Sequence, residues 1–433
     1  MNPWKSPTPN PSLAGGGNEV GARVPWCKSA YYLPERPAFT FDPLLHAGAY
    51  YVQEAGSMFL AQAIEQHMPN EPLVALDLCA APGGKSTLLR AMLHPDSLLV
   101  SNEPMRQRAQ VLAENILKWG HPNCMVTQNY PADFSQLTYT FDLVVADVPC
   151  SGEGMFRKDD EAIRDWSLEN VDTCWRRQRD IISDIWPTLK PGGLLIYSTC
   201  TFNRYEDEDN VQWICRELGA EQLTLRIDPS WGITGQYHFF PGKTRGEGFF
   251  LSVLRKADDE LRPFTSSESK SKKQKGKQNN NKVETAPRQV LDWLADGAWE
   301  LTPINPASDW VSALPARYAP LMNAMRKTLS VLVEGVPVAE QKGRDWMPAH
   351  GLALNTAYRR GAFPEVELTY DQALTYLRRE VLTIDAPRGI VLVTFAGLPL
   401  GFVKNLGNRA NNLYPQEWRI RSGYTTPFTL TAL

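Results

Sequence analysis

The sequence predicts an α/β fold whose parallel sheet is covered by helices on both faces. From residue 72 to residue 256, short apolar runs alternate with amphipathic runs, as in successive βαβ units. A glycine pair follows the first apolar run, and two cysteine motifs follow later ones. Because ligands in such sheets bind beyond the carboxyl ends of the strands, the three motifs predict one shared site.

The individual elements follow from apolar patterning and from glycine and proline breaks. Strands are expected at residues 73–78, 98–102, 125–128, 141–148 and 193–198, with an antiparallel hairpin at 237–240 and 248–254. Helices are expected at 57–67, 84–93 and 105–119, and a further amphipathic helix begins near Thr173. This last helix should break around Pro187, before the Pro-Gly-Gly turn at 191–193.

Composition limits the class of protein. The chain has 433 residues, of which 43% are hydrophobic, and its formal net charge is −3. No apolar run approaches the roughly 18 residues of a membrane helix, and the N-terminus has no apolar signal core. We therefore expect a cytoplasmic protein with no membrane partner, and a monomer by default. The slight acidity disfavours a purely electrostatic binder of nucleic acid, because phosphate contacts need clustered lysine and arginine.

Shifts in composition divide the chain into segments. Residues 1–22 are rich in Pro, Gly, Ser and Asn and are predicted to be disordered. The other predicted segments are the N-terminal part of the α/β region at 23–71, its core at 72–256, a polar linker at 257–285 and two C-terminal modules at 286–362 and 363–433. In these modules, helices at 291–294, 320–332 and 371–377 and strands at 389–395 and 400–404 indicate a small α+β or barrel-like structure.

The linker is basic. Between Thr265 and Val283 only Glu268 opposes its lysines, which are Lys270, Lys272, Lys273, Lys275, Lys277 and Lys282. Two interpretations stay open: a solvated linker, or a flexible tether that touches RNA phosphates.

The first motif, VALDLCAAPGGKS, predicts a ligand loop between a strand and a helix. Adjacent glycines let the backbone approach a ligand closely, and the start of the helix offers free N–H groups. A phosphate-binding P-loop would need glycine where Cys79 stands, which argues against an NTPase. Glu103 ends the second strand, about 20 residues after the turn, where an acidic side chain can accept hydrogen bonds from ribose hydroxyls. The pattern favours a nucleoside-bearing cofactor.

The seven cysteines include no C-x-x-C pair, so neither a zinc site nor any other metal is expected. Cys124, Cys174 and Cys215 are expected to pack as small hydrophobic side chains. Cys150 and Cys200 differ, because each follows an apolar strand beside the ligand loop.

A cysteine becomes a better nucleophile when a nearby cation lowers the pKa of its thiol. The candidate cations are Lys85, Arg157 and Lys158. Pro149 stops the strand before Cys150 and should direct Asp147 and Cys150 into the same crevice.

Together, DLCAAPGGKS, NE, DVPCSGEGMFRKD and STCTFNRYEDEDN resemble the Nop/Sun family of RNA cytosine-5 methyltransferases. VPWCKSAYYL and GAYYVQEAGSMF resemble its bacterial, RsmF-like ribosomal RNA branch. The likeness is close from Val24 to Leu254 and looser through the C-terminal segment. It implies a Rossmann-like, S-adenosylmethionine-dependent methyltransferase core and a C-terminal α+β PUA-like RNA-binding module. The implied substrate is ribosomal RNA, with 16S RNA of the small subunit favoured, and not DNA.

The resemblance also implies roles for single residues. Cys200 would add to carbon 6 of cytosine so that carbon 5 can attack the methyl group, Asp147 would stabilise charge on the base, and Cys150 would assist release. DNA cytosine methyltransferases attack with the Pro-Cys thiol and suggest the opposite order of the two thiols. The residues that would hold S-adenosylmethionine are Asp77, Cys79, Ala80, Ala81, Pro82, Gly83, Gly84, Lys85, Glu103 and Asp147.

Two features depart from the family pattern. Gln128, Asn129 and Tyr130 follow the third strand where an acidic residue near the adenine is expected, and Asn129 is the candidate replacement. The family also carries a longer N-terminal RNA-binding segment, of which only NPWKS remains here. Two other functions stay open: an RNA-binding assembly factor without turnover, and a methyltransferase that acts on DNA or on a small molecule.

The C-terminal segment adds an RNA-binding pattern, because Trp346–Leu354 and Gly397–Arg421 resemble the RsmF-like C-terminal modules. Interleaved basic, amide and aromatic side chains suit RNA backbones and unstacked bases, although a solvated strand face would look similar. These residues are Lys404, Arg409, Arg419, Arg421, Asn405, Asn408, Asn411, Asn412, Tyr414 and Trp418. A second basic cluster, Arg176, Arg177 and Arg179, either contacts RNA or forms salt bridges with Asp172 or Asp180.

Overall fold

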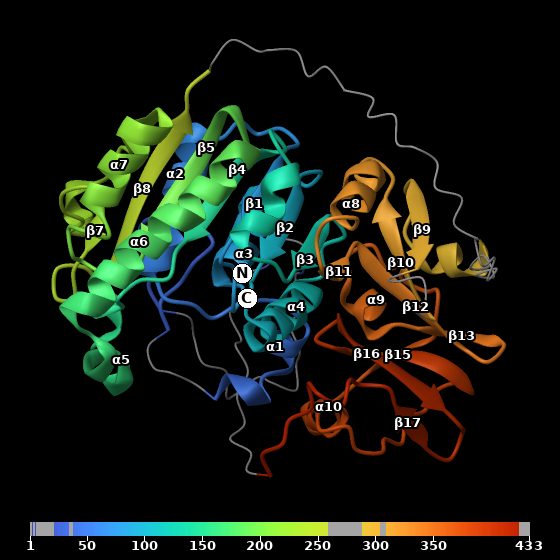
Figure 1. The fold of residues 1–433 in the computed structure, drawn as a ribbon. Helices are drawn as coiled ribbons and strands as arrows, with labels where there is room; N and C mark the ends of the chain where they lie inside the picture. The colour runs from blue at the N-terminus through green and yellow to red at the C-terminus, as the bar shows by residue number, and fades with distance from the viewer. Residues whose placement is uncertain are drawn as a thin grey trace, which may run out of the picture.

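The computed structural model describes residues 2, 5, 21–33, 38–258, 288–303 and 309–423. Its centre is a nine-stranded sheet in the order β11-β3-β2-β1-β4-β5-β8-β6, with β7 paired to β8 (Figure 1). The strands of this sheet are β1 Val74–Asp77, β2 Leu98–Asn102, β3 Cys124–Thr127, β4 Phe141–Asp147, β5 Leu189–Thr199, β6 Ala220–Leu223, β7 His238–Phe239, β8 Phe249–Lys256 and β11 Val331–Glu334. From β3 to β5 all neighbours are parallel, so the predicted α/β fold with a parallel sheet is confirmed.

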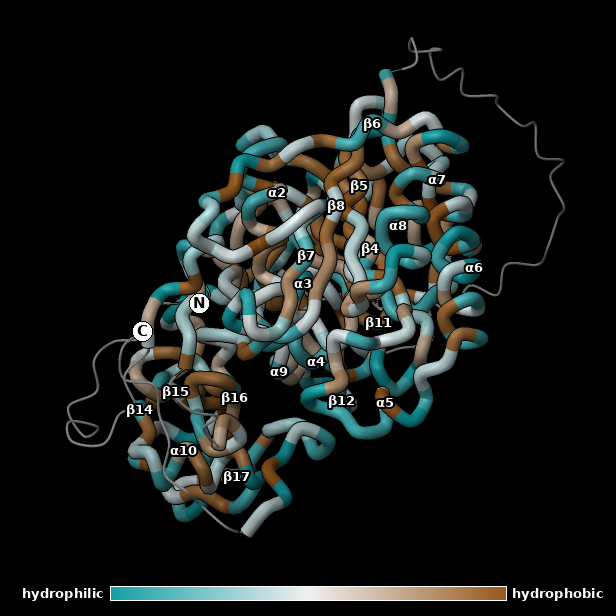
Figure 2. Tube along the Cα trace, turned by 90° about the vertical axis from the view of Figure 1, so that its left-hand side faces the viewer, coloured by the Kyte–Doolittle hydropathy of each residue, from teal (hydrophilic) through white to brown (hydrophobic). Residues whose placement is uncertain are grey.

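Helices cover both faces of this sheet because alternate strand residues enter two different cores. Ala75 and Val145 point into the core under α2 Leu60–His67, α3 Gly84–Met92 and α4 Arg106–Trp119. Leu76 and Val144 point into the core under α6 Leu168–Ile185 and α7 Glu208–Leu218. Hydrophobic residues concentrate along β4, β5 and β8 in the middle of the sheet (Figure 2). Burial on both faces explains why the central strands read as continuous apolar runs.

Local signals explain where the helices begin and end. The structure starts α6 at Leu168 instead of near Thr173, because Ser167 Oγ accepts a hydrogen bond from Asn170 N at 3.1 Å and caps the helix. The predicted break at Pro187 is confirmed by a 3₁₀ turn at Trp186–Thr188. Two short helices complete this part of the chain, α1 Pro43–His46 and α5 Asp160–Asp165.

The C-terminal region builds two four-stranded sheets, β13-β12-β10-β9 and β14-β15-β16-β17. The first consists of β9 Trp299–Pro303, β10 Trp310–Pro315, β12 Val336–Lys342 and β13 Asp345–Pro348. The second consists of β14 Glu365–Glu367, β15 Gly389–Phe395, β16 Leu398–Asn405 and β17 Ala410–Asn412. The helices are α8 Ala319–Met325, α9 His350–Leu354 and α10 Tyr370–Leu377, and residues 288–293 form a 3₁₀ helix. The predicted strands at 389–395 and 400–404 are both present.

The predicted boundary between the α/β core and the first C-terminal module is wrong at one strand. Residues 320–332 were expected to be one helix, but α8 ends at Met325 and β11 begins at Val331. Strand β11 pairs antiparallel with β3, as Val331 opposite Thr127 shows. The chain therefore returns to the core sheet and covers an edge that β3 would otherwise expose.

The expectation of disorder for residues 1–22 fails at the four of them that the structure describes, Asn2, Lys5, Gly21 and Ala22, and the last two pair with Tyr32. Asn2 Nδ2 donates to Trp119 O at 2.8 Å, and Lys5 Nζ donates to Ala47 O at 2.8 Å, with both side chains buried. These bonds satisfy main-chain carbonyls at the end of α4 and after α1, which a disordered segment would leave unpaired.

The basic linker at 257–285 lies outside the described residues beyond Asp258. None of the helices built from the described residues combines the length and the apolar character needed to span a bilayer.

Candidate active site

The three predicted motifs meet at the carboxyl edge of the sheet. Strands β1, β4 and β5 are adjacent and parallel, with Asp77 aligned to Val145 and Asp147 aligned to Ser198. Their ends therefore bring the glycine loop, Asp147 and both cysteines to one place. The reversal of strand order between β1 and β4 is where such sheets bind ligands.

The glycine loop after β1 is held by main-chain contacts. Ala80 N donates to Asn102 O at 2.8 Å, and Asn115 Nδ2 donates to Pro82 O at 2.8 Å. Gly83 has a φ of 121°, which favours glycine, and a Cβ on Gly84 would lie 2.8 Å from Gln53 Oε1. The backbone at Gly83 therefore favours glycine, whereas a Cβ at Gly84 would only displace the flexible end of the Gln53 side chain. The first N–H groups of α3 have no partner within the helix and are available to a ligand.

Asp77 leaves one buried oxygen without a partner. Its Oδ2 accepts from Ser86 Oγ at 2.7 Å, whereas no described group bonds Oδ1. Burial raises the pKa of Asp77 to about 7. A buried, unsatisfied carboxylate oxygen beside a glycine loop fits a polar ligand that donates to it.

Two residues at the end of β2 shape the other side of the crevice. Glu103 is 2% exposed, and its Oε1 accepts from Met105 N at 3.0 Å. Asn102, which the sequence did not single out, donates from Nδ2 to Leu78 O and to Asn129 O at 3.0 and 2.9 Å. It thereby ties the glycine loop to the loop after β3.

Asn129 does not offer the free polar group that was expected for the adenine. Its Oδ1 accepts from Ser330 N at 3.0 Å, and its Nδ2 donates to Asp133 Oδ2 at 3.3 Å. The side chain instead fixes the segment that leads into β11. Asp133 also accepts from Tyr130 N at 2.9 Å, so the same carboxylate holds the start of the turn that follows β3.

The two cysteines at the strand ends are in direct contact. Cys150 Sγ lies 3.2 Å from Cys200 Sγ, and Cys200 N donates to Cys150 Sγ at 3.3 Å. Both are free thiols. The prediction that the two motifs bring their cysteines together is confirmed.

Lys85 is the cation of this centre. Its Nζ donates to Asp147 Oδ2 at 2.8 Å, while Ser198 Oγ donates to Asp147 Oδ1 at 2.7 Å. Burial alone would lower the pKa of Lys85, but Asp147 outweighs it and raises that pKa. Arg157 and Lys158, the other candidates, pair instead with Glu247 at 3.4 and 3.9 Å.

The environment makes the two thiols unequal. The hydrogen bond from the Cys150 thiol lowers the pKa of Cys200, and Lys85 acts in the same direction against the effect of burial. The hydrogen bond to Cys200, burial and the charge on Cys200 all raise the pKa of Cys150. The pair therefore ionises first at Cys200, with Cys150 as the remaining thiol.

This asymmetry predicts selective alkylation. Cys200 is expected to react with iodoacetamide faster than Cys174 or Cys215 near neutral pH, because the thiolate is the reactive form and burial raises the pKa of the other two. Its rate should rise with pH and level off below 9.0, the ordinary pKa of the group. Mass spectrometry of labelled peptides across pH measures this. Faster labelling of Cys150, or a rate still climbing above pH 9.0, would contradict the assignment.

A buried carboxylate, which the sequence did not reveal, joins the two cysteine loops. Glu206 is 0% exposed, and it accepts from Ser151 N at 3.1 Å, Gln178 Nε2 at 2.6 Å and Asn203 Nδ2 at 2.7 Å. Ser151 Oγ also donates to it. Because these donors come from both cysteine loops and from α6, Glu206 fixes the two cysteine loops relative to each other.

Next to it, one group of described residues brings carboxylate and imidazole ligand atoms within 4.8 Å of one another: Asp207, Glu208 and His238. Asp207 Oδ1 accepts from Thr199 Oγ1 at 2.6 Å, and His238 Nε2 lies 2.9 Å from Glu208 Oε1. The first contact anchors the start of α7 to the end of β5, and the second anchors it to β7.

The predicted basic clusters separate into exposed and structural residues. Arg176 pairs with Asp172 at 3.1 Å, and Arg179 donates to Asn210 Oδ1 at 2.8 Å with its guanidinium 4.1 Å from the Trp175 ring. Salt bridging was one of the two interpretations of that cluster. In the C-terminal pattern, Asn405 and Tyr414 are buried, so the exposed members are Lys404, Asn408, Arg409, Asn411 and Arg421.

Comparison with known proteins matches three parts of the chain to family models. The family model of the 16S rRNA methyltransferase RsmB/F matches residues 65–255. The model of the methyltransferase RsmF PUA domain matches 363–420, and that of the N-terminal domain of 16S rRNA methyltransferase RsmF matches 1–55. The expected PUA-like module is thus confirmed, and the N-terminal segment also matches its family.

Individual relatives agree with the family models. Ribosomal RNA small subunit methyltransferase F of Shewanella oneidensis is 30% identical over 416 residues, which cover 91% of this chain and 84% of that protein. The protein of the same name from Citrobacter koseri is 32% identical over 417 residues, with the same coverage. A structure of NSun6 from Pyrococcus horikoshii with SFG covers 53% of this chain and 60% of that chain, at 28% identity and a TM-score of 0.46.

S-adenosylmethionine is the cofactor of this methyltransferase core. The residues at the edge of the sheet fit it, because a glycine turn, a buried acceptor on Asp77 and the buried carboxylate of Glu103 lie at the ends of the adjacent strands β1 and β2. With matches over more than four fifths of these relatives' own length, the chain belongs to the family of the ribosomal RNA small subunit methyltransferase F proteins.

Proposed function

We propose that this protein transfers the methyl group of S-adenosylmethionine to carbon 5 of a cytosine in 16S ribosomal RNA, through a covalent bond between Cys200 and the base. The observation that carries the proposal is the pair of thiols 3.2 Å apart at the ends of two adjacent parallel strands. One thiol suffices for covalent addition, and a second beside it supports a separate release step. The protein would act as a monomer in the cytoplasm, with RNA as its partner.

The chain's own residues would hold the cofactor as the resemblance implies. Glu103 would accept hydrogen bonds from the ribose hydroxyls, and the main chain of Cys79–Gly84 would contact the rest of the cofactor. Asp77 Oδ1 would accept from a donor on the cofactor, which removes its unsatisfied state. The bound cofactor supplies an electrophilic methyl group on a sulfonium sulfur.

The addition step would use the thiolate of Cys200. A bond forms between Cys200 Sγ and carbon 6, the electron pair of the 5,6 double bond moves toward the N3 side of the ring, and N3 takes a proton from solvent. Asp147, held between Lys85 and Ser198, would accept hydrogen bonds from this edge of the base and stabilise the adduct. Carbon 5 would then carry the electron density needed to attack the electrophilic methyl group that bound S-adenosylmethionine would supply, with the electron pair of the broken sulfur–carbon bond staying on that sulfur.

Release would depend on Cys150. Once Cys200 is a thioether, it no longer carries the charge that helps raise the pKa of Cys150, so Cys150 loses its proton to solvent. The new thiolate takes the proton from carbon 5, the 5,6 double bond re-forms, and the bond to Cys200 breaks as N3 returns its proton to solvent. Cys150 then donates again to the Cys200 thiolate, as in the resting pair.

The RNA must present an unpaired or flipped cytosine, because carbon 6 of a stacked base is out of reach. Exposed basic side chains of β16 and the segments after it, Lys404, Arg409 and Arg421, support binding of the RNA backbone.

The decisive test is methyl transfer from labelled S-adenosylmethionine to unmodified small-subunit RNA, offered naked and as assembled subunits. Digestion and mass spectrometry of the nucleosides should find new 5-methylcytidine with the native chain and none with Cys200→Ala, a loss of at least about 10²- to 10⁴-fold. Cofactor binding without transfer to either form would favour the RNA-binding assembly factor. Equal methyl transfer to DNA would contradict the proposal that the substrate is RNA.

A further inference from the structure

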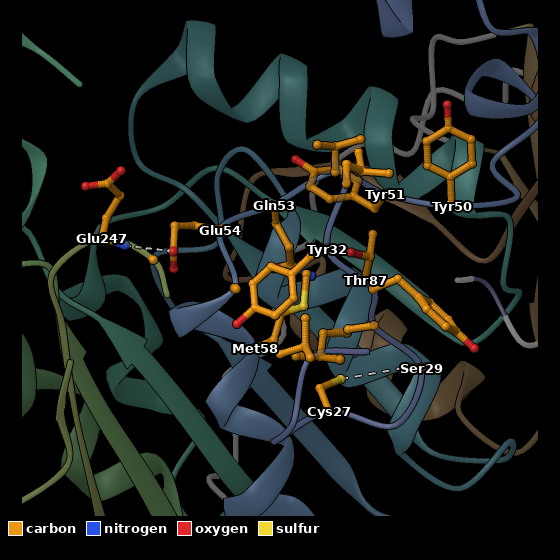
Figure 3. Close-up of a pocket in the computed structure, with 18 of the residues that line it drawn as sticks. Cys27, Ser29, Tyr32, Tyr50, Tyr51, Gln53, Glu54, Met58, Thr87 and Glu247 are labelled. Atoms are coloured by element: carbon orange, nitrogen blue, oxygen red, sulfur yellow. Dashed lines mark hydrogen bonds between the residues drawn. The ribbon is translucent and has the colours of Figure 1, made fainter. Parts of the chain in front are cut away.

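A cavity of about 1040 Å³ lies next to the reaction centre and takes no part in the chemistry above. Its walls come from segments 24–33 and 50–58, from helix α3, and from the loops 157–158 and 245–247. In the view of Figure 3, Tyr32 lies between the Glu54–Glu247 contact on one side and Thr87 on the other, with Tyr51 above it. The size is at the upper end of the roughly 300–1,000 Å³ of ligand pockets.

The cavity is distinct from the cofactor crevice. The described residues that line it include neither the glycine loop 77–84, nor Glu103, nor either cysteine of the pair. It is nevertheless joined to the reaction centre. Gly154 N donates to Cys200 O at 2.8 Å, and Gly248 N donates to Gly154 O at 3.3 Å. The loops that carry Arg157 and Arg245 therefore extend from the backbone around the nucleophile.

The lining pairs aromatic rings with cations. The guanidinium of Arg245 lies 4.1 Å from the centre of the Tyr32 ring, and Tyr32 Oη donates to Arg245 O at 3.2 Å. Tyr31 and Tyr51 add two further half-buried rings. Single-stranded RNA is recognised by bases stacked on aromatic rings or on arginine planes, so Arg245 and Tyr32 already form one side of such a stack.

The carboxylates in the lining are occupied within the protein. Glu54 Oε1 accepts from Glu247 N at 2.9 Å, and Glu247 is the partner of Arg157 and Lys158. Arg245 has no ion-pair partner within the described ranges. The acidic groups therefore position the loops, and the Arg245 guanidinium stays on the Tyr32 ring. Because Arg157 and Lys158 share the single carboxylate of Glu247, that end of the cavity keeps a net positive charge that suits a phosphate.

We propose that this cavity binds a nucleotide next to the target cytosine in single-stranded RNA, with its base on the Arg245–Tyr32 stack and its phosphate near Arg157 and Lys158. That the nucleotide in this cavity lies beside a cytosine under attack by Cys200 rests on the proposed function. The cavity would thus help to hold the strand while the cytosine enters the cleft above Cys200.

Equilibrium binding tests this without requiring methyl transfer. The probe is a fluorescein-labelled oligouridine with one central cytosine, with and without a complementary strand, followed by fluorescence anisotropy. Tyr32→Ala and Arg245→Ala should each lower the affinity for the single strand about 5- to 150-fold, which corresponds to the loss of one base–aromatic stack. Tyr32→Phe keeps the ring and should bind as the native chain does. Arg216→Ala, an exposed cation of α7 paired with Glu217, is the matched control and should have little effect.

An abasic scan locates the contact. Removing the base at one position beside the cytosine should lower the affinity of the native chain as much as Tyr32→Ala does. The same removal should cause no further loss of affinity in Tyr32→Ala. The inference is overturned if, at every position, the loss of affinity caused by the abasic site adds to the loss caused by Tyr32→Ala. It is also overturned if the duplex binds as tightly as the single strand. If the native chain and the variants bind as predicted but no 5-methylcytidine forms, the proposed reaction is rejected and this site is retained. If Tyr32→Ala and Arg245→Ala leave the rate of methylation unchanged, this site alone is rejected.

Discussion

Cys150→Ala should leave the protein covalently joined to its RNA. Cys200 still adds to carbon 6 and methyl transfer still occurs, but the group that takes the proton from carbon 5 is missing, so the bond between Cys200 and the base persists. Loss of a general base slows its step by about 10²- to 10⁴-fold. Labelled RNA that migrates with the protein on a denaturing gel measures the adduct, and mass spectrometry of the attached peptide identifies its cysteine.

Matched variants decide the order of the two thiols. Cys200→Ala and the double variant should form no adduct, and Cys215→Ala, a half-buried cysteine of α7 away from the pair, should behave as the native chain. An adduct that accumulates in Cys200→Ala and not in Cys150→Ala would reverse the roles and agree with the order used by DNA cytosine methyltransferases.

The second large effect concerns stability. Glu206→Ala is expected to lower the free energy of unfolding by about 3–5 kcal/mol, because buried donors on Ser151, Gln178 and Asn203 lose their acceptor. Activity should fall with it at temperatures where the protein is still folded, since the loops of Cys150 and Cys200 are no longer tied together. Urea unfolding followed by circular dichroism measures the free energy.

Two controls separate the network from a general effect of charge. Glu206→Gln keeps one oxygen acceptor and the shape of the side chain, so its loss should be smaller than that of Glu206→Ala. Glu217→Ala removes an exposed glutamate of α7 and should stay within about 0.5 kcal/mol of the native chain. A change below about 1 kcal/mol for Glu206→Ala would show that the buried carboxylate is not what holds the two loops.

Much of the site could be predicted because its parts are local. A strand that ends in an acidic residue and a glycine pair specifies a turn and a helix start within ten residues. Each cysteine motif likewise follows its own strand. Once the strands are parallel and adjacent, geometry alone brings Cys150 and Cys200 together, and their sulfur atoms lie 3.2 Å apart.

The errors concern partners that are distant in the sequence. Arg157 and Lys158 are near Cys150 along the chain, yet they pair with Glu247, and Lys85 reaches Asp147 from the other side of the crevice. The local sequence around Asn129 gives no sign that its Oδ1 accepts from Ser330 N, a residue 201 positions later in the chain. No periodicity or motif connects such residues, because their contact depends on how whole elements pack.

The sequence by itself therefore determined the α/β class, the order of most strands and helices in the core, the glycine loop and the two cysteines at the ends of neighbouring strands. It could do so because apolar alternation, glycine turns and strand-end motifs act over a few residues. Only the tertiary structure decided that β11 completes the core sheet at β3, that Glu206 joins the cysteine loops, and that a cavity lined by tyrosines forms beside the loops of Arg157 and Arg245. Those features depend on hydrogen bonds and packing between segments far apart in the chain, which form only when the whole molecule has folded.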